Sequence, residues 1–224
     1  MATSVLKVLK SMRIDLPSLE QYPKSHSTTF SFYMGVIYFA EEDYATARES
    51  LSKALTQCYN FSSRNKELIL MYLIPAQFLT TRKTPGKEIW EKYPILRHLY
   101  KDMFDSLLQG NIALFNKAMM ERRTILVKKY LYLAIERIQA LVYTRLFKKV
   151  YLIMDNPTRL SINLFSEALK FAGDENQDTS SDQVECYLAD MIYLGRMKGY
   201  ISRERKTLVL SSKEAFPKQI KKID

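Results

Sequence analysis

The chain has 224 residues, a formal net charge of +10, 47% hydrophobic residues and 26% charged residues. These values are typical of a folded globular protein, and the length allows a sizeable core in one domain or in two closely joined ones. The six glycines form neither a P-loop nor a dinucleotide fingerprint, which argues against a nucleotide-dependent enzyme. No apolar run is long enough to cross a bilayer, so no membrane partner is expected.

The residues that usually carry catalysis or metal binding are scarce. Cys58 and Cys186 are the only cysteines, His26 and His98 the only histidines, and their spacing fits neither a zinc site nor a disulfide framework. Each cysteine is therefore expected to be a small buried residue in a helix. No nucleophile lies in a recognisable motif and no carboxylate pair flanks a plausible cleft. We expect no enzyme activity, no cofactor and no small-molecule substrate.

The positive charge is concentrated near the C-terminus. Residues 1–112 hold 14 Lys and Arg against 11 Asp and Glu, giving +3, whereas residues 113–224 hold 20 against 13, giving +7. Residues 196–222 alone hold nine basic and two acidic residues, which is also +7. A positive end on a compact body indicates a polyanionic neighbour, which is either a phosphate backbone or an acidic protein.

The first half of the sequence is typical of stacked helices. A short amphipathic helix is predicted over residues 5–12, ending before Pro17. From Ser27 the run SFYMGVIYFAEEDYATARESLSKALTQCY has the small and large residues of a tetratricopeptide-type helical hairpin. The positions that carry this pattern are Gly35, Tyr38, Ala47, Leu51 and Ala54. Further helices are predicted over 65–79 around Pro75, within 81–94, over 95–109 before Gly110, and over 112–120 and 124–134.

The C-terminal part follows the order helix, helix, helix, hairpin, which is the order of a winged helix. Apolar residues recur at helical spacing from Arg137 to Met154. A second helix is predicted from the N-cap Ser161 to Gly173, and a third follows the polar run DENQDTSSD with Asp182 at its start. The segments YIS and TLVL on either side of RERK predict a hairpin that must pack on the helices.

Three of these runs carry a family resemblance. LVYTRLFKKVYLI, LSINLFSEALKF and VECYLADMIYLGRMKGYIS resemble the C-terminal half of a PCI domain, and the apolar helix NKELILMYLIPAQFL is similar to members that serve mRNA export at the nuclear pore or, in yeasts, the signalosome. The resemblance covers roughly residues 27–212. Such members are usually longer at the N-terminus, so a C-terminal fragment or a shortened member is expected.

The resemblance implies a mostly α-helical fold, in which a TPR-like helical repeat stack is capped by a C-terminal winged helix. We place the repeats at 1–136, the winged helix at 137–212 and a basic tail at 213–224. The implied role is that of a nuclear scaffold, with the cytoplasm also allowed, in mRNA export, mRNA splicing or the signalosome. The implied partners are a second PCI protein, a small acidic disordered subunit, and RNA or DNA bound without sequence preference.

Two sets of residues are candidates for these contacts. The predicted phosphate contacts are Arg145, Lys148, Lys149, Arg196, Lys198, Arg203, Arg205 and Lys206. The predicted protein contacts are Tyr187, Tyr193, Tyr200, Ile201 and Val209. The third helix carries Asp182, Glu185 and Asp190 before its first basic residue, which argues against reading bases in a major groove. A pure protein adaptor, whose basic surface meets an acidic partner, remains the alternative.

Overall fold

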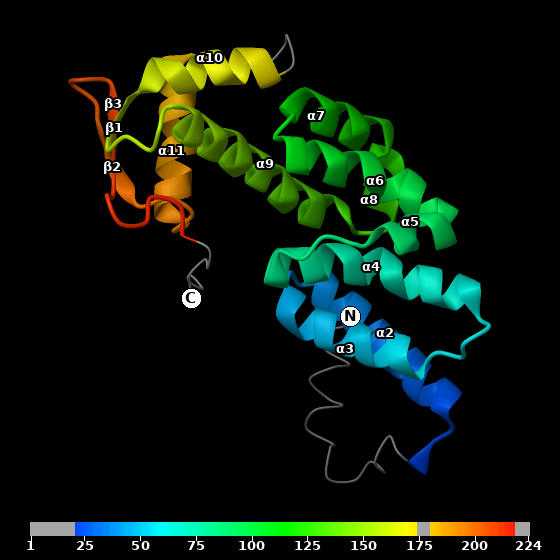
Figure 1. Cartoon of the computed structure of the whole chain (residues 1–224). Coiled ribbons are helices and arrows are strands. Elements are labelled where there is room, and N and C mark those ends of the chain that lie inside the picture. Colours follow the sequence, from blue (N-terminus) through cyan, green and yellow to red (C-terminus); the bar gives the residue numbers. More distant parts are fainter. Residues whose placement is uncertain (1–20, 174–179, 218–224) are drawn as a thin grey trace. The chain divides into compact units, whose positions relative to one another are not determined.

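The computed structural model describes residues 21–173 and 180–217, which are coloured along the sequence in Figure 1. The chain divides into two compact units. The first unit is Met1–Lys101 with Arg122–Ile138, and the second is Asp102–Glu121 with Gln139–Asp224. The helix predicted at 5–12, most of the polar run before Asp182 and the end of the basic tail lie outside the described residues. No helix in the described ranges has the length and apolar character of a membrane span.

Helices dominate both units, as the sequence predicts. The first unit holds α2 (Lys24–Ala40), α3 (Tyr44–Gln57), α4 (Ser63–Thr81), α5 (Lys87–Lys92) and α8 (Arg123–Lys128). The second holds α7 (Ile112–Glu121), β1 (Arg159–Ser161), α10 (Ile162–Ala172), α11 (Ser181–Tyr193), β2 (Gly199–Ser202) and β3 (Thr207–Leu210). Two helices, α6 (Pro94–Gln109) and α9 (Tyr132–Ile153), begin in the first unit and continue into the second.

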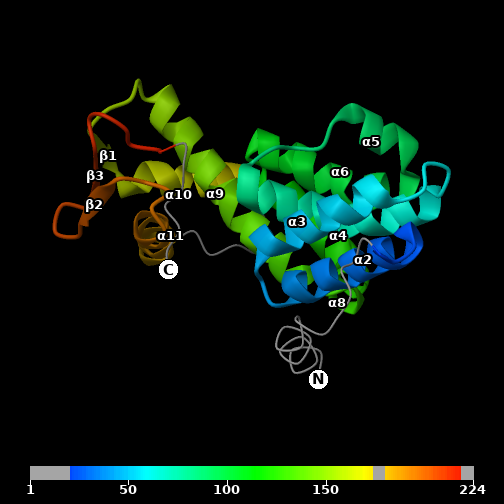
Figure 2. The ribbon, with the colours of Figure 1, turned by 90° about the horizontal axis from the view of Figure 1, so that it is seen from below.

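The predicted helical hairpin is formed by α2 and α3, which lie side by side with α4 in both ribbon views (Figures 1 and 2). Asp43 caps α3, because its side chain accepts a hydrogen bond from the Thr46 N–H at 3.2 Å. Gly35 is buried at the crossing, where a Cβ would lie 2.5 Å from Leu51 Cγ. Glycine therefore sets how closely the two helices approach each other.

Replacing Gly35 by alanine should lower the free energy of unfolding by about 1–3 kcal/mol, because the new methyl group overpacks a filled crossing. Urea unfolding followed by the fluorescence of Trp90, which lies in the same unit, measures this change. In a double-mutant cycle, Gly35→Ala should cost less in the Leu51→Ala background than in the parent, because Leu51→Ala removes the clashing atoms. Additive effects of the two substitutions would show that the crossing does not limit the packing.

The helix around Pro75 is buried along most of its C-terminal half. In α4 the residues from Ile69 to Ala76 are all buried, and the helix continues past Pro75 to Thr81. Tyr100 from α6 is fully buried and donates a hydrogen bond from its hydroxyl to the Met71 carbonyl oxygen at 2.6 Å. Burial raises the pKa of the Tyr100 phenol well above its ordinary value, so this donor stays protonated. A buried hydroxyl that is satisfied in this way fixes α6 on α4.

One predicted helix is broken by a turn. The pattern over 124–134 predicts a single helix, but α8 ends at Lys128 and α9 begins at Tyr132. Between them Tyr130 adopts a left-handed φ of 57°, and the Leu131 N–H donates to the Leu126 carbonyl oxygen at 2.8 Å. Leu131 is completely buried at this turn. The sequence did not predict the break, because the spacing of apolar residues is the same for a broken helix as for a continuous one. The domain boundary predicted between residues 136 and 137 lies inside α9.

The second unit contains the predicted winged helix. Strands β2 and β3 form the hairpin, which we call the wing, and β1 pairs with the other edge of β3 to give the sheet order β1-β3-β2. The three-residue β1 was not predicted from the sequence. All strand pairs are antiparallel. Val209 of β3 lies between Arg159 of β1 on one side and Tyr200 of β2 on the other. The inner face of the sheet buries Leu160, Leu208 and Leu210.

Aromatic and aliphatic side chains fill the space between the helices of this unit. Phe147 of α9 and Phe165 of α10 are both fully buried, with ring centroids 5.0 Å apart in an edge-to-face arrangement. Val184, Leu188 and Met191 bury the inner stripe of α11, as the helical spacing predicts. Cys186 lies on the opposite side of α11 and is exposed, so the prediction that it is buried was wrong, whereas Cys58 is buried as predicted.

Candidate nucleic-acid and protein interface on the winged helix

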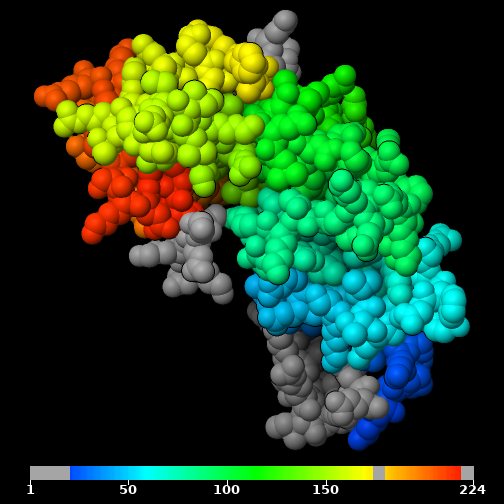
Figure 3. Space-filling view, viewed as in Figure 1, coloured from blue at the N-terminus to red at the C-terminus, as the bar shows by residue number. Residues whose placement is uncertain are grey.

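The wing ends in a turn of four charged residues, Arg203, Glu204, Arg205 and Lys206, which we call the wing turn. All four side chains are exposed, and the turn carries a formal charge of +2. In the space-filling view the hairpin, coloured orange to red, lies at the surface (Figure 3). Three of the eight predicted phosphate contacts are therefore brought together at one end of the sheet.

The wing turn is fixed to the helices behind it. Arg203 Nε donates to Glu185 Oε2 of α11 at 3.1 Å, and the Ile162 N–H at the start of α10 donates to the Lys206 carbonyl oxygen at 3.0 Å. Within the turn, the Lys206 N–H donates to the Arg203 carbonyl oxygen at 3.1 Å. These bonds hold the backbone of the turn, so Arg205 and Lys206 extend into solvent from a preorganised base.

The ion pair also changes the charge of the third helix. The sequence predicts that the carboxylates of α11 repel phosphate, but Glu185 is only 9% exposed and is paired with Arg203. The Arg203 side chain remains 87% exposed, so its guanidinium has room for a second, anionic partner. Asp182 and Asp190 are exposed on α11, so their negative charges remain at the surface of this helix.

Other predicted phosphate contacts take part in the structure of the unit itself. Lys198, just before β2, forms an ion pair with Glu214 at 2.6 Å. Arg196 Nη1 donates to the Ala140 carbonyl oxygen of α9 at 3.3 Å, and Lys149 Nζ donates to the Gln109 carbonyl oxygen. These three cations stabilise junctions between elements, whereas Arg145 is exposed and Lys148 is half-buried on α9. Three of the eight predicted cations therefore already have partners within the unit.

The outer face of the sheet joins two of the predicted protein contacts to a residue that the sequence analysis missed. Tyr200, Val209 and Arg159 form one row across the three strands, and Tyr200 is 62% exposed. Ile201 alternates to the inner face opposite Leu208 and is half-buried. Arg159 could have been found only if β1 had been predicted, because its place in this row depends on the pairing with β3.

The two tyrosines of α11 have different environments. Tyr187 is half-buried and stacks on Tyr143 of α9, with ring centroids 4.6 Å apart, so it joins two helices of its own unit. Tyr193 is 77% exposed at the C-terminal end of α11 and remains available to a partner. The segment after β3 packs back on the unit as well, since Ala215 is buried and the Phe216 ring lies 5.4 Å from the Tyr151 ring.

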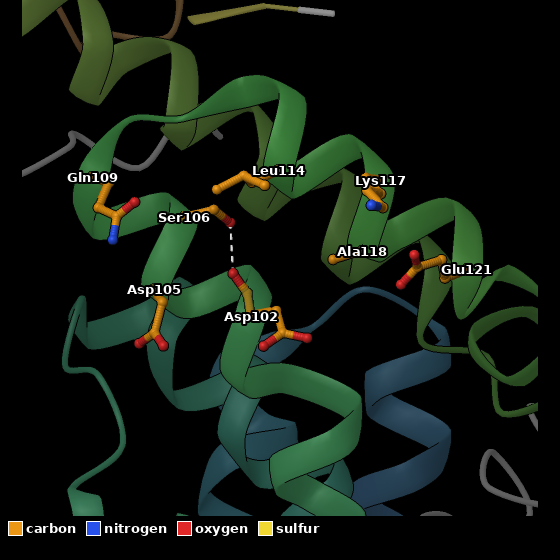
Figure 4. A pocket seen from close by; sticks show the side chains of 8 residues that line it. All are labelled: Asp102, Asp105, Ser106, Gln109, Leu114, Lys117, Ala118 and Glu121. Carbon is orange, nitrogen blue, oxygen red and sulfur yellow. Dashed lines mark hydrogen bonds between the residues drawn. The ribbon is translucent and has the colours of Figure 1, made fainter.

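A shallow pocket lies between α6 and α7 of the same unit (Figure 4). Its volume is about 350 Å³, and it is lined by Asp102, Asp105, Ser106, Gln109, Leu114, Lys117, Ala118 and Glu121. Ser106 Oγ donates to the Asp102 carbonyl oxygen at 2.7 Å rather than pointing into free space. In the described part of the chain, no group of three or more His, Cys, Asp and Glu side chains could hold a metal ion.

Comparison with known proteins identifies the class. The PCI domain matches residues 95–212, which is more than half of the chain and includes the whole winged helix. The chain therefore belongs to the PCI domain family, and the helical stack with a terminal winged helix is the fold that the sequence predicts.

Relatives cover nearly all of this chain. A protein of Yarrowia lipolytica named Protein CSN12 homolog is 46% identical over 218 residues, covering 97% of this chain and 54% of that protein. The protein of the same name from Schizosaccharomyces pombe is 37% identical, covering 95% and 50%. PCI domain-containing protein 2 of Xenopus laevis is 33% identical, covering 88% and 48%. The chain thus spans about half the length of the curated relatives it matches.

Proposed function

We propose that the chain is a non-enzymatic scaffold subunit of a nuclear complex in mRNA processing or export. In this proposal it pairs with a second PCI protein and a small acidic subunit, and its wing binds the nucleic-acid backbone without sequence preference. The fixed wing turn carries the proposal, because it presents Arg205 and Lys206 on a rigid base. The nearby carboxylate of Glu185 is paired with Arg203, which reduces its repulsion of phosphate. Lysine and arginine at phosphates give affinity that does not depend on base identity.

The outer sheet face supports the protein-pairing part of the proposal. Tyr200 and Val209 offer an aromatic and an aliphatic side chain beside each other, with Arg159 next to them in the same row. A mixed aromatic and cationic surface of this kind is typical of the centre of a protein interface. The nucleic-acid part uses the turn at one end of the strands, so one small sheet can serve both partners.

The wing-turn double variant Arg205→Ala/Lys206→Ala tests the nucleic-acid part. Binding of the full chain to a generic single-stranded RNA is measured by fluorescence anisotropy over a range of salt concentrations. The variant should bind more weakly and lower the slope of log K against log salt by about 1.4, because each phosphate contact on a single strand contributes roughly 0.7. Neither side chain is buried, so folding should be unchanged.

Lys128→Ala/Lys129→Ala is the matched control, because it removes the same charge from exposed positions of the first unit. It should leave the salt slope near that of the parent. Equal losses in both variants would indicate a general effect of net charge and would contradict a wing site.

A protein adaptor without nucleic-acid binding, associated with the signalosome, is the second candidate. The observation in its favour is that three of the predicted cations, Lys149, Arg196 and Lys198, form hydrogen bonds or an ion pair within the unit. In that case the parent chain should show no affinity for single-stranded RNA, either alone or with its co-purified partners, while Tyr200→Ala should still weaken the assembly.

A further inference from the structure

Two aromatic side chains stand exposed in the loop between α3 and α4 of the first unit. Tyr59 is 70% exposed and Phe61 is 85% exposed, and their ring centroids lie 5.5 Å apart at an interplanar angle of 56°. We call them the ring pair. Keeping two neighbouring rings in water forgoes the stabilisation that their burial would give. Exposed apolar groups of this kind commonly mark a binding surface.

The residues around the ring pair are of types that are common in nucleic-acid contacts. Residues 59–66 read YNFSSRNK, so amides, hydroxyls and cations surround the two rings. Three cations, Lys53, Arg64 and Lys66, lie between Leu51 and Lys66, and no acidic residue occurs in that stretch. Lys66 Nζ donates to Asn60 Oδ1 at 3.1 Å, which keeps this ammonium group beside the loop. Arg64 is exposed.

The backbone adds a second source of positive potential. Helix α4 begins at Ser63, directly after the ring pair, and its first turn contains no acidic residue. The side chain of its N-cap residue, Ser62, makes no capping hydrogen bond. The N–H groups and the helix dipole at this end favour a negatively charged group. Rings, cations and helix terminus therefore converge on one loop.

We propose that the ring pair is a contact for single-stranded nucleic acid, in which Tyr59 and Phe61 stack on bases while Arg64 and Lys66 meet the flanking phosphates. This inference rests on the proposed function, because it adds a second contact region to a chain whose wing binds the nucleic-acid backbone. Stacking tolerates any sequence, since every base has a π-face. The loop offers two flat rings and no exposed aliphatic side chain between Tyr59 and Lys66, which favours bases over an apolar peptide side chain.

The test uses the full chain and a labelled oligouridine of roughly eight nucleotides, a length within the site sizes of single-strand binders. Tyr59→Ala/Phe61→Ala should weaken binding about tenfold or more, because base stacking is lost. Its salt slope should stay near that of the parent, because no phosphate contact is removed. Arg64→Ala/Lys66→Ala should instead lower the slope by about 1.4.

Two further variants separate stacking from a structural effect. Tyr59→Phe/Phe61→Tyr keeps both rings and should restore binding. Tyr33→Ala removes another exposed aromatic, 61% exposed on α2 of the same unit, and should bind like the parent. Inorganic polyphosphate, which has charge but no bases, should bind the parent and the ring-pair variant equally.

The outcomes distinguish this inference from the proposed function. Unchanged RNA binding in Tyr59→Ala/Phe61→Ala, together with a loss in Arg205→Ala/Lys206→Ala, would overturn the ring-pair contact and leave the wing contact standing. If the parent binds no RNA, both proposals fail. If an oligoglutamate peptide binds in a ring-dependent manner and oligouridine does not, the occupant is an acidic protein segment and the nucleic-acid assignment is wrong.

Discussion

Replacing Phe165 by alanine should lower the free energy of unfolding of the second unit by about 3–5 kcal/mol. The Phe165 ring is fully buried and lies edge-to-face against Phe147, so its removal leaves a cavity between α9 and α10. The only tryptophan, Trp90, lies in the first unit and does not report on this change. Hydrogen exchange resolved on peptides of the second unit, with urea unfolding followed by circular dichroism, measures the loss.

Phe171→Ala is the matched control on the same helix. Its side chain is 94% exposed near the C-terminal end of α10, so the substitution removes the same atoms without opening a cavity. The expected change is within about 0.5 kcal/mol. Similar losses for the two variants would contradict the assignment of Phe165 to the core of the winged helix.

Replacing Gly199 by alanine should lower the free energy of unfolding by about 3 kcal/mol and disorder the wing. A Cβ at this position would lie 2.3 Å from the Val209 carbonyl oxygen and 3.2 Å from Leu210 Cα. Both atoms belong to the backbone of β3, which cannot move aside without breaking strand pairing. Nucleic-acid affinity should fall as well, although no cation is removed, because the base of the wing turn is lost.

Gly86→Ala provides the comparison for this substitution, since a Cβ there would meet nothing within 4 Å. It should leave both stability and nucleic-acid binding close to those of the parent. If Gly199→Ala retained full binding, the wing turn would not need the hairpin that supports it.

The helices and the wing could be predicted because their signals are local. The small Gly35 and the large Leu51 occupy positions typical of a helical hairpin. The run TLVL alternates as a strand with one buried face. The apolar stripe of α11 was predicted for the same reason. Each of these patterns is complete within about twenty residues, so no tertiary contact is needed to read it.

What could not be predicted depends on contacts between distant positions. Strand β1 is only three residues long, too short for alternation to be recognised, and it exists because it pairs with β3. Arg203 and Glu185 are far apart in the sequence, so the pairing of this one carboxylate of α11 with the wing becomes visible only in the fold. The turn at Tyr130 has a left-handed conformation that no glycine or asparagine announces.

The candidate site was predicted in part, because charge is readable in a sequence but its use is not. All eight cations look alike in the sequence, yet Lys198 is paired with Glu214 and Arg196 donates to a carbonyl oxygen of α9, while Arg205 and Lys206 extend from a fixed turn. A cation that already has an internal partner loses that contact when it binds phosphate. Arg205 and Lys206 are therefore the part of the predicted set that we expect to dominate binding.

Protection of Lys206 from acetylation by bound RNA tests most directly whether the wing turn holds phosphate. The full chain is treated with a lysine-acetylating reagent, with and without saturating single-stranded RNA, and modification at each lysine is followed by mass spectrometry. Lys206 should react severalfold more slowly in the presence of RNA, and high salt should abolish that protection. Lys129, exposed in the first unit, should react at the same rate throughout. An unchanged rate at Lys206 under saturating RNA would contradict a phosphate site on the wing.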